Sequence, residues 1–106
     1  MDIFVNELKE RLDSGESPTM IDVRQPQEWE MQHLGGVIKI SLANLPDSLD
    51  ELAQYKDKEV IMICRSGGRS GQATQFLSQQ GFTNVRNMSG GMLAWKSFID
   101  PNFNVV

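Results

Sequence analysis

Short runs rich in apolar and β-branched residues alternate along the chain with segments in which apolar residues recur every three or four positions. The runs lie at residues 19–24, 37–40, 60–63 and 84–88, and their length and composition are typical of strands. No hairpin turn joins one run to the next, so successive strands have to pair in parallel through right-handed crossovers. The pattern predicts a single α/β domain over residues 1–106, with a small, mostly parallel sheet of about four to five strands and helices on both faces.

The segments between these runs have the spacing of helices with one apolar face. In the first segment, Phe4, Leu8 and Leu12 recur at every fourth position, and Asp2 is placed to cap the helix. Gly81 stands where the helix after residue 70 is expected to end. The predicted helices span about residues 2–14, 26–31, 44–53, 70–80 and 92–98.

The composition is that of a folded domain with an acidic balance. Hydrophobic residues make up 40% of the 106 residues, which is enough for one core, and the net charge is −4. Binding to nucleic acid depends on basic surface, so we expect no nucleic-acid partner. The chain has no apolar run long enough to span a membrane and no signal-peptide pattern, so we expect no membrane partner and a cytoplasmic location.

The chain has one cysteine and one histidine. A single cysteine cannot form an internal disulfide, so the fold does not depend on an oxidising compartment. The cysteine also has no second cysteine to which it could pass a bound group, so any acceptor has to be another molecule. With one cysteine and one histidine, we expect no metal site.

Cys64 directly follows the apolar run at 60–63 and opens the sequence CRSGGRS. It therefore lies at the carboxyl end of a strand, on a loop that enters a helix, which is where ligands bind in open α/β sheets. Gly67 and Gly68 can adopt backbone conformations that turn several N–H groups inward. The helix N-terminus adds its dipole, and two arginines in the loop add full positive charges. The loop is thus suited to an anion.

A thiol in such a field loses its proton easily. Comparable settings lower the pKa of a cysteine from about 8.5 to roughly 3.5–7.5. We therefore expect Cys64 to be a thiolate, or an anion derived from one, near neutral pH. A lone cysteine after an apolar strand is more often an inert core residue, but two arginines and two glycines within five positions favour the reactive interpretation.

At this point the sequence resembles the rhodanese family of sulfurtransferases. The loop is similar to the active-site loop of that family, and the resemblance extends over residues 19–103 in the family's order. The chain departs from the usual pattern at Gly35, where the family has proline, and at Val37, where it has alanine. The segments that carry the resemblance are residues 21–29, 32–41, 64–70, 81–85, 87–95 and, more weakly, 100–103.

Several residues outside the loop are predicted to support it. Asp22 and Arg24 follow each other near a strand end with opposite charges, so we expect a buried or half-buried ion pair. The sole histidine belongs, by resemblance, to the scaffold around a turn and not to the chemistry. The turn at residues 89–91 is expected to lie beside the cysteine loop. The supporting residues are Asp22, Arg24, His33, Gly90, Gly91 and the core residue Trp95.

The resemblance implies a double-displacement sulfur transfer without a cofactor. The Cys64 thiolate takes the outer sulfur of a small anionic donor such as thiosulfate and becomes a persulfide. Cyanide, a thiol or a protein thiol then removes that sulfur. The expected substrate-binding residues supply inward N–H groups, two guanidinium groups and two hydroxyl groups, and they are Arg65, Ser66, Gly67, Gly68, Arg69 and Ser70.

Two alternatives remain open on the sequence alone. Cysteine-dependent phosphatases and arsenate reductases use a similar loop with one more residue between cysteine and arginine, and they need a carboxylic acid that this sequence does not mark. The shorter loop forms a tighter ring of N–H groups, which fits one sulfur atom better than a tetrahedral oxyanion. The other alternative is a sulfur-relay or regulatory binding module with little small-molecule turnover.

Overall fold

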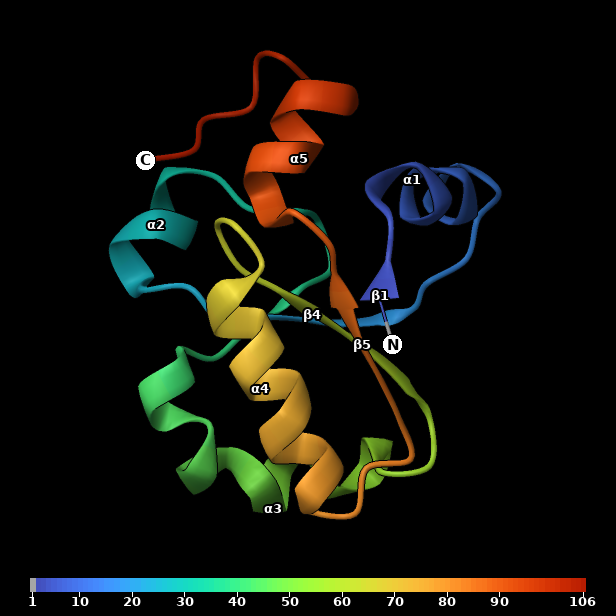
Figure 1. Cartoon of the computed structure of the whole chain (residues 1–106), viewed down its shortest axis with the longest axis vertical. Coiled ribbons are helices and arrows are strands. Elements are labelled where there is room, and N and C mark those ends of the chain that lie inside the picture. Colours follow the sequence, from blue (N-terminus) through green and yellow to red (C-terminus); the bar gives the residue numbers. More distant parts are fainter. Residues whose placement is uncertain (1) are drawn as a thin grey trace.

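Five parallel strands form one sheet in the computed structural model, which describes residues 2–106 (Figure 1). Their order across the sheet is β1-β5-β4-β2-β3, so β4 is the central strand and is paired on both sides. The predicted parallel sheet is confirmed, although β2 and β3 are shorter than the runs that predicted them. The strands are β1 (Asp2–Ile3), β2 (Thr19–Asp22), β3 (Ile38–Lys39), β4 (Glu59–Ile63) and β5 (Asn84–Met88).

Helices cover both faces of the sheet, as predicted. Figure 1 shows α1 and α5 on one side and α3 and α4 on the other. Among residues 2–106, no helix combines the length and the hydropathy needed to cross a membrane. The α-helices are α1 (Val5–Asp13), α2 (Pro26–Met31), α3 (Leu49–Leu52), α4 (Gly68–Gln79) and α5 (Gly91–Phe98), and the 3-10 helices are η1 (Leu42–Asn44), η2 (Pro46–Ser48) and η3 (Ala53–Tyr55).

The central strand divides the core into two clusters. Successive side chains of a strand point to opposite faces. Val60 and Met62 therefore pack among residues of α3 and α4, while Ile61 and Ile63 pack among residues of α1 and α5. All four are fully buried, which explains the unbroken apolar run. The same alternation places the next residue, Cys64, on the α4 side of the sheet.

The prediction for the N-terminus is wrong at its start. Asp2 does not cap a helix, because Asp2 and Ile3 form the edge strand β1 and pair with β5. Ile3 is fully buried there, and its carbonyl accepts the backbone N–H of Ser89 at 3.0 Å. The helix begins only at Val5, and Phe4, which the helical spacing had placed on the apolar face, is 69% exposed. Burial of Ile3 in the sheet outweighs one further turn of helix.

The helix predicted over residues 44–53 is broken into 3-10 turns and one short α-helix. Pro46 has no N–H to donate, and its ring restricts the turn before it. The hydroxyl of Ser48 also donates to the carbonyl of Asn44 at 3.0 Å, which competes with the regular helical ladder. The leucines that suggested the helix still face the core, and Leu45 and Leu52 are buried.

The predicted ion pair at the end of β2 is confirmed. Arg24 donates from Nε to Oδ1 of Asp22 at 2.9 Å and from Nη2 to Oδ2 at 2.8 Å. Their side chains are only 0% and 1% exposed, so both charges lie in the interior. Nη2 of Arg24 also donates to the carbonyl of Gln32, just after α2, at 2.8 Å. The pair therefore ties the carboxyl end of β2 to the end of α2.

We expect Asp22→Ala to lower the free energy of unfolding by about 3–5 kcal/mol, because it leaves the Arg24 charge buried without a partner. Urea denaturation of both proteins measures the difference. Asp13→Ala is the matched control, since it removes an exposed pair with Lys9 (2.9 Å) and should cost about 0.5 kcal/mol or less. Wild-type stability in Asp22→Ala would contradict a structural role for the pair.

Candidate active site

The cysteine loop leaves the carboxyl end of β4 and enters α4 at Gly68. Gly67 forms the N-cap of this helix with a φ of 101°, a left-handed conformation that glycine adopts without a Cβ penalty. The turn brings the backbone N–H of Gly67 back to the side chain of Cys64, just after the end of β4. The loop is thus positioned by the central strand on one side and by the longest helix of the described residues on the other.

The sulfur of Cys64 accepts two hydrogen bonds from this turn. The backbone N–H of Gly67 donates to Sγ at 3.0 Å, and the hydroxyl of Ser70 lies 3.2 Å from it. The residue is 0% exposed, so the sulfur lies beneath the loop. Two hydrogen-bond donors and the start of α4 therefore surround the sulfur. Of the other loop residues predicted to bind substrate, Ser66 and Gly68 are exposed.

Asn87, at the end of β5, also holds the loop, and the sequence analysis did not identify it. Its Nδ2 donates to the carbonyl of Gly67 at 3.2 Å, and the Ser70 hydroxyl donates to its Oδ1. The Ser70 hydrogen is therefore shared between the amide of Asn87 and the sulfur of Cys64. Strand alternation with Val85 could have indicated this role, because it places Asn87 on the α4 side of the sheet.

The turn between β5 and α5 packs directly against the cysteine loop, as predicted. Two N–H groups in the first turn of α5 donate to this loop. The N–H of Met92 donates to the carbonyl of Cys64 at 2.8 Å, and the N–H of Leu93 donates to the carbonyl of Arg65 at 2.9 Å. Gly91 has a φ of 60°, and a Cβ at this position would lie 2.5 Å from the carbonyl oxygen of Cys64. Only a residue without a side chain allows this close approach.

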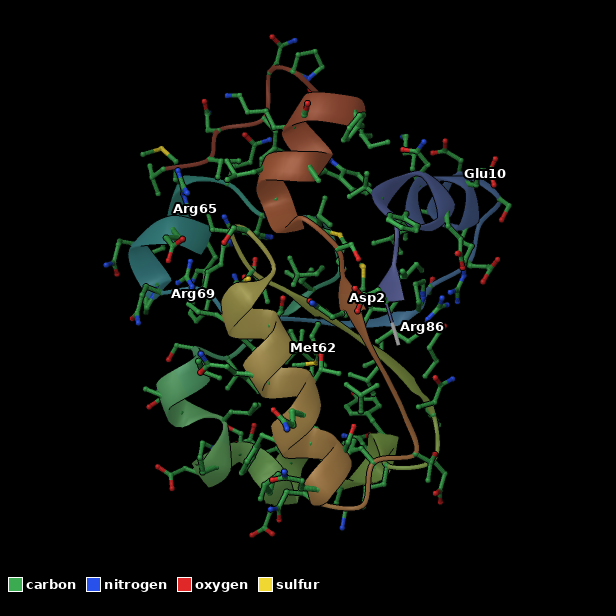
Figure 2. All side chains as sticks on the ribbon, in the orientation of Figure 1. Asp2, Glu10, Met62, Arg65, Arg69 and Arg86 are labelled. Carbon is green, nitrogen blue, oxygen red and sulfur yellow. The ribbon has the colours of Figure 1, made fainter. Side chains whose placement is uncertain are left out.

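Both arginines of the loop have partners in the structure. Arg69 forms a bidentate ion pair with Glu28 of α2, with distances of 2.5 Å and 2.9 Å between nitrogens and carboxylate oxygens. Arg65 donates from Nε to the carbonyl of Val106 at 2.6 Å. Figure 2 shows both arginines extending from the loop on the side of α2. Each uses only part of its five N–H groups in these bonds, so donors remain for a substrate.

Glu28 is a second residue whose role the sequence analysis missed. It accepts the backbone N–H of Gln25 at 3.1 Å and so completes the capping box of α2. The Arg69 guanidinium holds the pKa of Glu28 below its ordinary value, and the Glu28 carboxylate in turn raises the pKa of Arg69. The capping-box spacing was readable in the sequence, but the contact with Arg69 depends on how α2 lies over the loop.

A family model described as a rhodanese-like domain matches residues 4–98. The chain belongs to the rhodanese family. This confirms the resemblance carried by the loop and by the segments around it.

Known proteins resemble this rhodanese domain along most of its length. It is 35% identical to a sulfurtransferase of Allochromatium vinosum over 88 residues, which cover 83% of this chain and 80% of that protein. It is 36% identical over 102 residues to the probable adenylyltransferase/sulfurtransferase MoeZ of Mycobacterium tuberculosis, covering 94% of this chain but spanning only 26% of MoeZ. A crystal structure of a rhodanese-like domain protein from Staphylococcus aureus has a TM-score of 0.84 at 27% identity and covers 100% and 99% of the two chains. The first two of these proteins are named as sulfurtransferases.

The remaining predicted residues lie in the scaffold of the rhodanese domain. His33 is exposed, and its Nδ1 lies 2.9 Å from the carbonyl oxygen of Leu34. Trp95 is 5% exposed and packs in the cluster between the sheet and helices α1 and α5. Among residues 2–106, no three histidine, cysteine or acidic side chains gather as metal ligands would.

We expect Gly91→Ala to lower the free energy of unfolding by about 2–4 kcal/mol and to reduce sulfur transfer, because the added methyl group strains the backbone and pushes the Cys64 carbonyl away. Thermal unfolding and an activity assay measure the two effects. Gly35→Ala is the matched control, since Gly35 has open space around its Cα and no positive φ. Equal stability of the two variants would contradict the close packing of the two turns.

The ion pair of Glu28 predicts a pH dependence of stability. Because the pKa of Glu28 is lowered below 4.5 in the folded protein, the pair stabilises the fold above that pH and loses its effect as pH falls through the folded-state pKa. We expect the free energy of unfolding of wild type to exceed that of Glu28→Gln by about 1–2 kcal/mol at neutral pH. This difference in stability should shrink below pH 4.5. Urea denaturation across this range measures it, and a difference that stays constant into acid would contradict the pairing.

Proposed function

We propose that this rhodanese domain moves a sulfane sulfur from thiosulfate, or a similar donor, to a thiophilic acceptor through a persulfide on Cys64. The observation that carries the proposal is the setting of the sulfur. The sulfur lies at the end of the central strand and faces the start of α4. It accepts one hydrogen bond from the N–H of Gly67 and one from the hydroxyl of Ser70. A nucleophile stabilised in this way as an anion needs no general base, so the exposed His33 has no part in the reaction.

The reaction has two displacements. The Cys64 thiolate attacks the outer sulfur of thiosulfate, the new S–S bond forms, and the S–S bond of the donor breaks, so that sulfite leaves with the bonding electron pair. A nucleophilic acceptor then attacks the outer sulfur of the persulfide and returns Cys64 as a thiolate. Cyanide becomes thiocyanate in this step, and a thiol becomes a persulfide after losing its proton to solvent. The chain has one cysteine, so a thiol acceptor is another molecule.

The loop contributes electrostatic stabilisation to both steps. The N–H of Gly67 donates to the sulfur of Cys64, and we expect the main-chain N–H groups from Arg65 to Ser70 to stabilise charge that develops on the outer sulfur and on the leaving sulfite. The remaining N–H groups of Arg65 and Arg69 hold the oxygens of the donor. Because Cys64 is 0% exposed, a donor has to pass between the residues that cover the sulfur. This favours a donor that presents a single narrow sulfur atom, as thiosulfate does.

The same geometry argues against phosphatase or arsenate reductase chemistry. A tetrahedral phosphorus centre surrounded by oxygens is broader than one sulfur atom and fits poorly over a buried nucleophile. That chemistry also needs a carboxylic acid to protonate the leaving group. Asp22 and Glu28 lie near the loop, but each already accepts hydrogen bonds from an arginine in an ion pair, and the Arg69 guanidinium holds the pKa of Glu28 below its ordinary value.

Thiocyanate formation from thiosulfate and cyanide tests the proposal. We expect turnover by wild type with parallel double-reciprocal lines, as a covalent intermediate requires, and none by Cys64→Ser. Ser70→Ala should lower kcat/KM about tenfold, because it removes a hydrogen bond to an anionic sulfur. Ser48→Ala is the matched control, since its hydroxyl bonds only a carbonyl of the helical segment before α3. Turnover by Cys64→Ser, or hydrolysis of an aryl phosphate in place of thiocyanate formation, would overturn the proposal.

A further inference from the structure

The positive charge of Arg69, which the sequence suggested for binding an anionic donor, is offset by a carboxylate. Glu28 contacts both terminal nitrogens of the guanidinium. The Glu28 carboxylate is fixed and not free to swing away, because its side chain is 11% exposed and it also bonds the backbone N–H of Gln25 at 3.1 Å. An anion that approaches the loop therefore meets the sum of the two charges.

A second ion pair next to the loop also combines one positive and one negative charge. Asp22 and Arg24 lie at the end of β2, beside the strand that carries Cys64, and their charges also cancel. The two pairs together bring two positive and two negative charges to this side of the site. The net attraction for an anion then comes from Arg65, the loop N–H groups and the start of α4. Of the two carboxylates, Glu28 is the one that contacts a loop arginine.

We propose that Glu28 tunes the selectivity of this site for the charge of the sulfur donor. Its carboxylate lowers the preference of the site for dianionic donors over monoanionic donors. The inference rests on the proposed function and adds to it the class of donor. Glu28 acts through Arg69 and is a positioning residue. Its carboxylate repels a donor in proportion to the donor's charge, so a dianion loses twice the interaction energy that a monoanion loses at the same place.

Two donors that deliver the same sulfur make this measurable. Thiosulfate carries two negative charges, and benzenethiosulfonate carries one. In both cases the Cys64 thiolate attacks the outer sulfur, an S–S bond forms at Cys64 and the S–S bond of the donor breaks. The leaving group takes the electron pair as sulfite or as benzenesulfinate. Cyanide then discharges the same persulfide, so the ratio of kcat/KM for the two donors reports on the first step alone.

We expect Glu28→Gln to raise the ratio of kcat/KM for thiosulfate over benzenethiosulfonate about fivefold, because glutamine keeps the size of the side chain and removes its charge. The ratio should also fall more steeply with added salt than in wild type, since a more positive site is screened more. Glu59→Gln is the matched control. Glu59 is also held by arginines, Arg11 and Arg86, but lies at the opposite end of β4 from Cys64.

A second pair of variants keeps the test valid if Glu28→Gln folds poorly. Arg69→Gln leaves the Glu28 charge without its partner and should lower the ratio below that of wild type. The double variant Glu28→Gln/Arg69→Gln should restore part of that loss. An unchanged ratio in Glu28→Gln, or a double variant no better than Arg69→Gln, would overturn this inference and leave the proposed function standing. If wild type transferred sulfur from neither donor, the proposed function would fail and the inference with it.

Discussion

The close packing of two strand-to-helix turns is the constraint on which the site depends. The start of α5 donates two N–H groups to the carbonyls of Cys64 and Arg65, while the N–H of Gly67 in the same loop donates to the sulfur of Cys64. Gly91 permits the approach because it has no side chain. The backbone of the cysteine loop is thus held by contacts between residues 28 positions apart in the chain (92 − 64 and 93 − 65).

Ion pairs between arginines and acidic side chains hold α2 against this pair of turns. One pair joins the end of β2 to the end of α2, and the other joins α2 to the cysteine loop. Each pair is stabilised by its geometry and its hydrogen bonds, and each would be costly to break from one side. The pairs also decide the electrostatics of the site. From the sequence, the two arginines of the loop were expected to act as two free positive charges. In the folded domain, Arg69 forms an ion pair with Glu28 and Arg65 donates to a backbone carbonyl.

Much of the fold and the centre of the site could be predicted because the relevant signals are local. The apolar run before Cys64 and the glycines after it place the loop, and the strand at Asn84–Met88 was predicted with its observed bounds. The edge strand at Ile3 could not be predicted, because its two residues gain their stability by pairing with a distant strand. Glu28 and Asn87 were missed for the same reason. Local spacing indicates which face of the sheet Asn87 occupies and that Glu28 belongs to a capping box, but their contacts with the loop depend on how β5 and α2 lie beside it.

The most direct test of the central claim, that Cys64 carries the transferred sulfur, is the intact mass of the protein after incubation with thiosulfate and removal of the donor. The account predicts that wild type gains the mass of one sulfur atom, that Cys64→Ser gains none, and that cyanide removes the added atom while thiocyanate forms. A wild-type mass that does not change, or an added sulfur that is also found in Cys64→Ser, would contradict it.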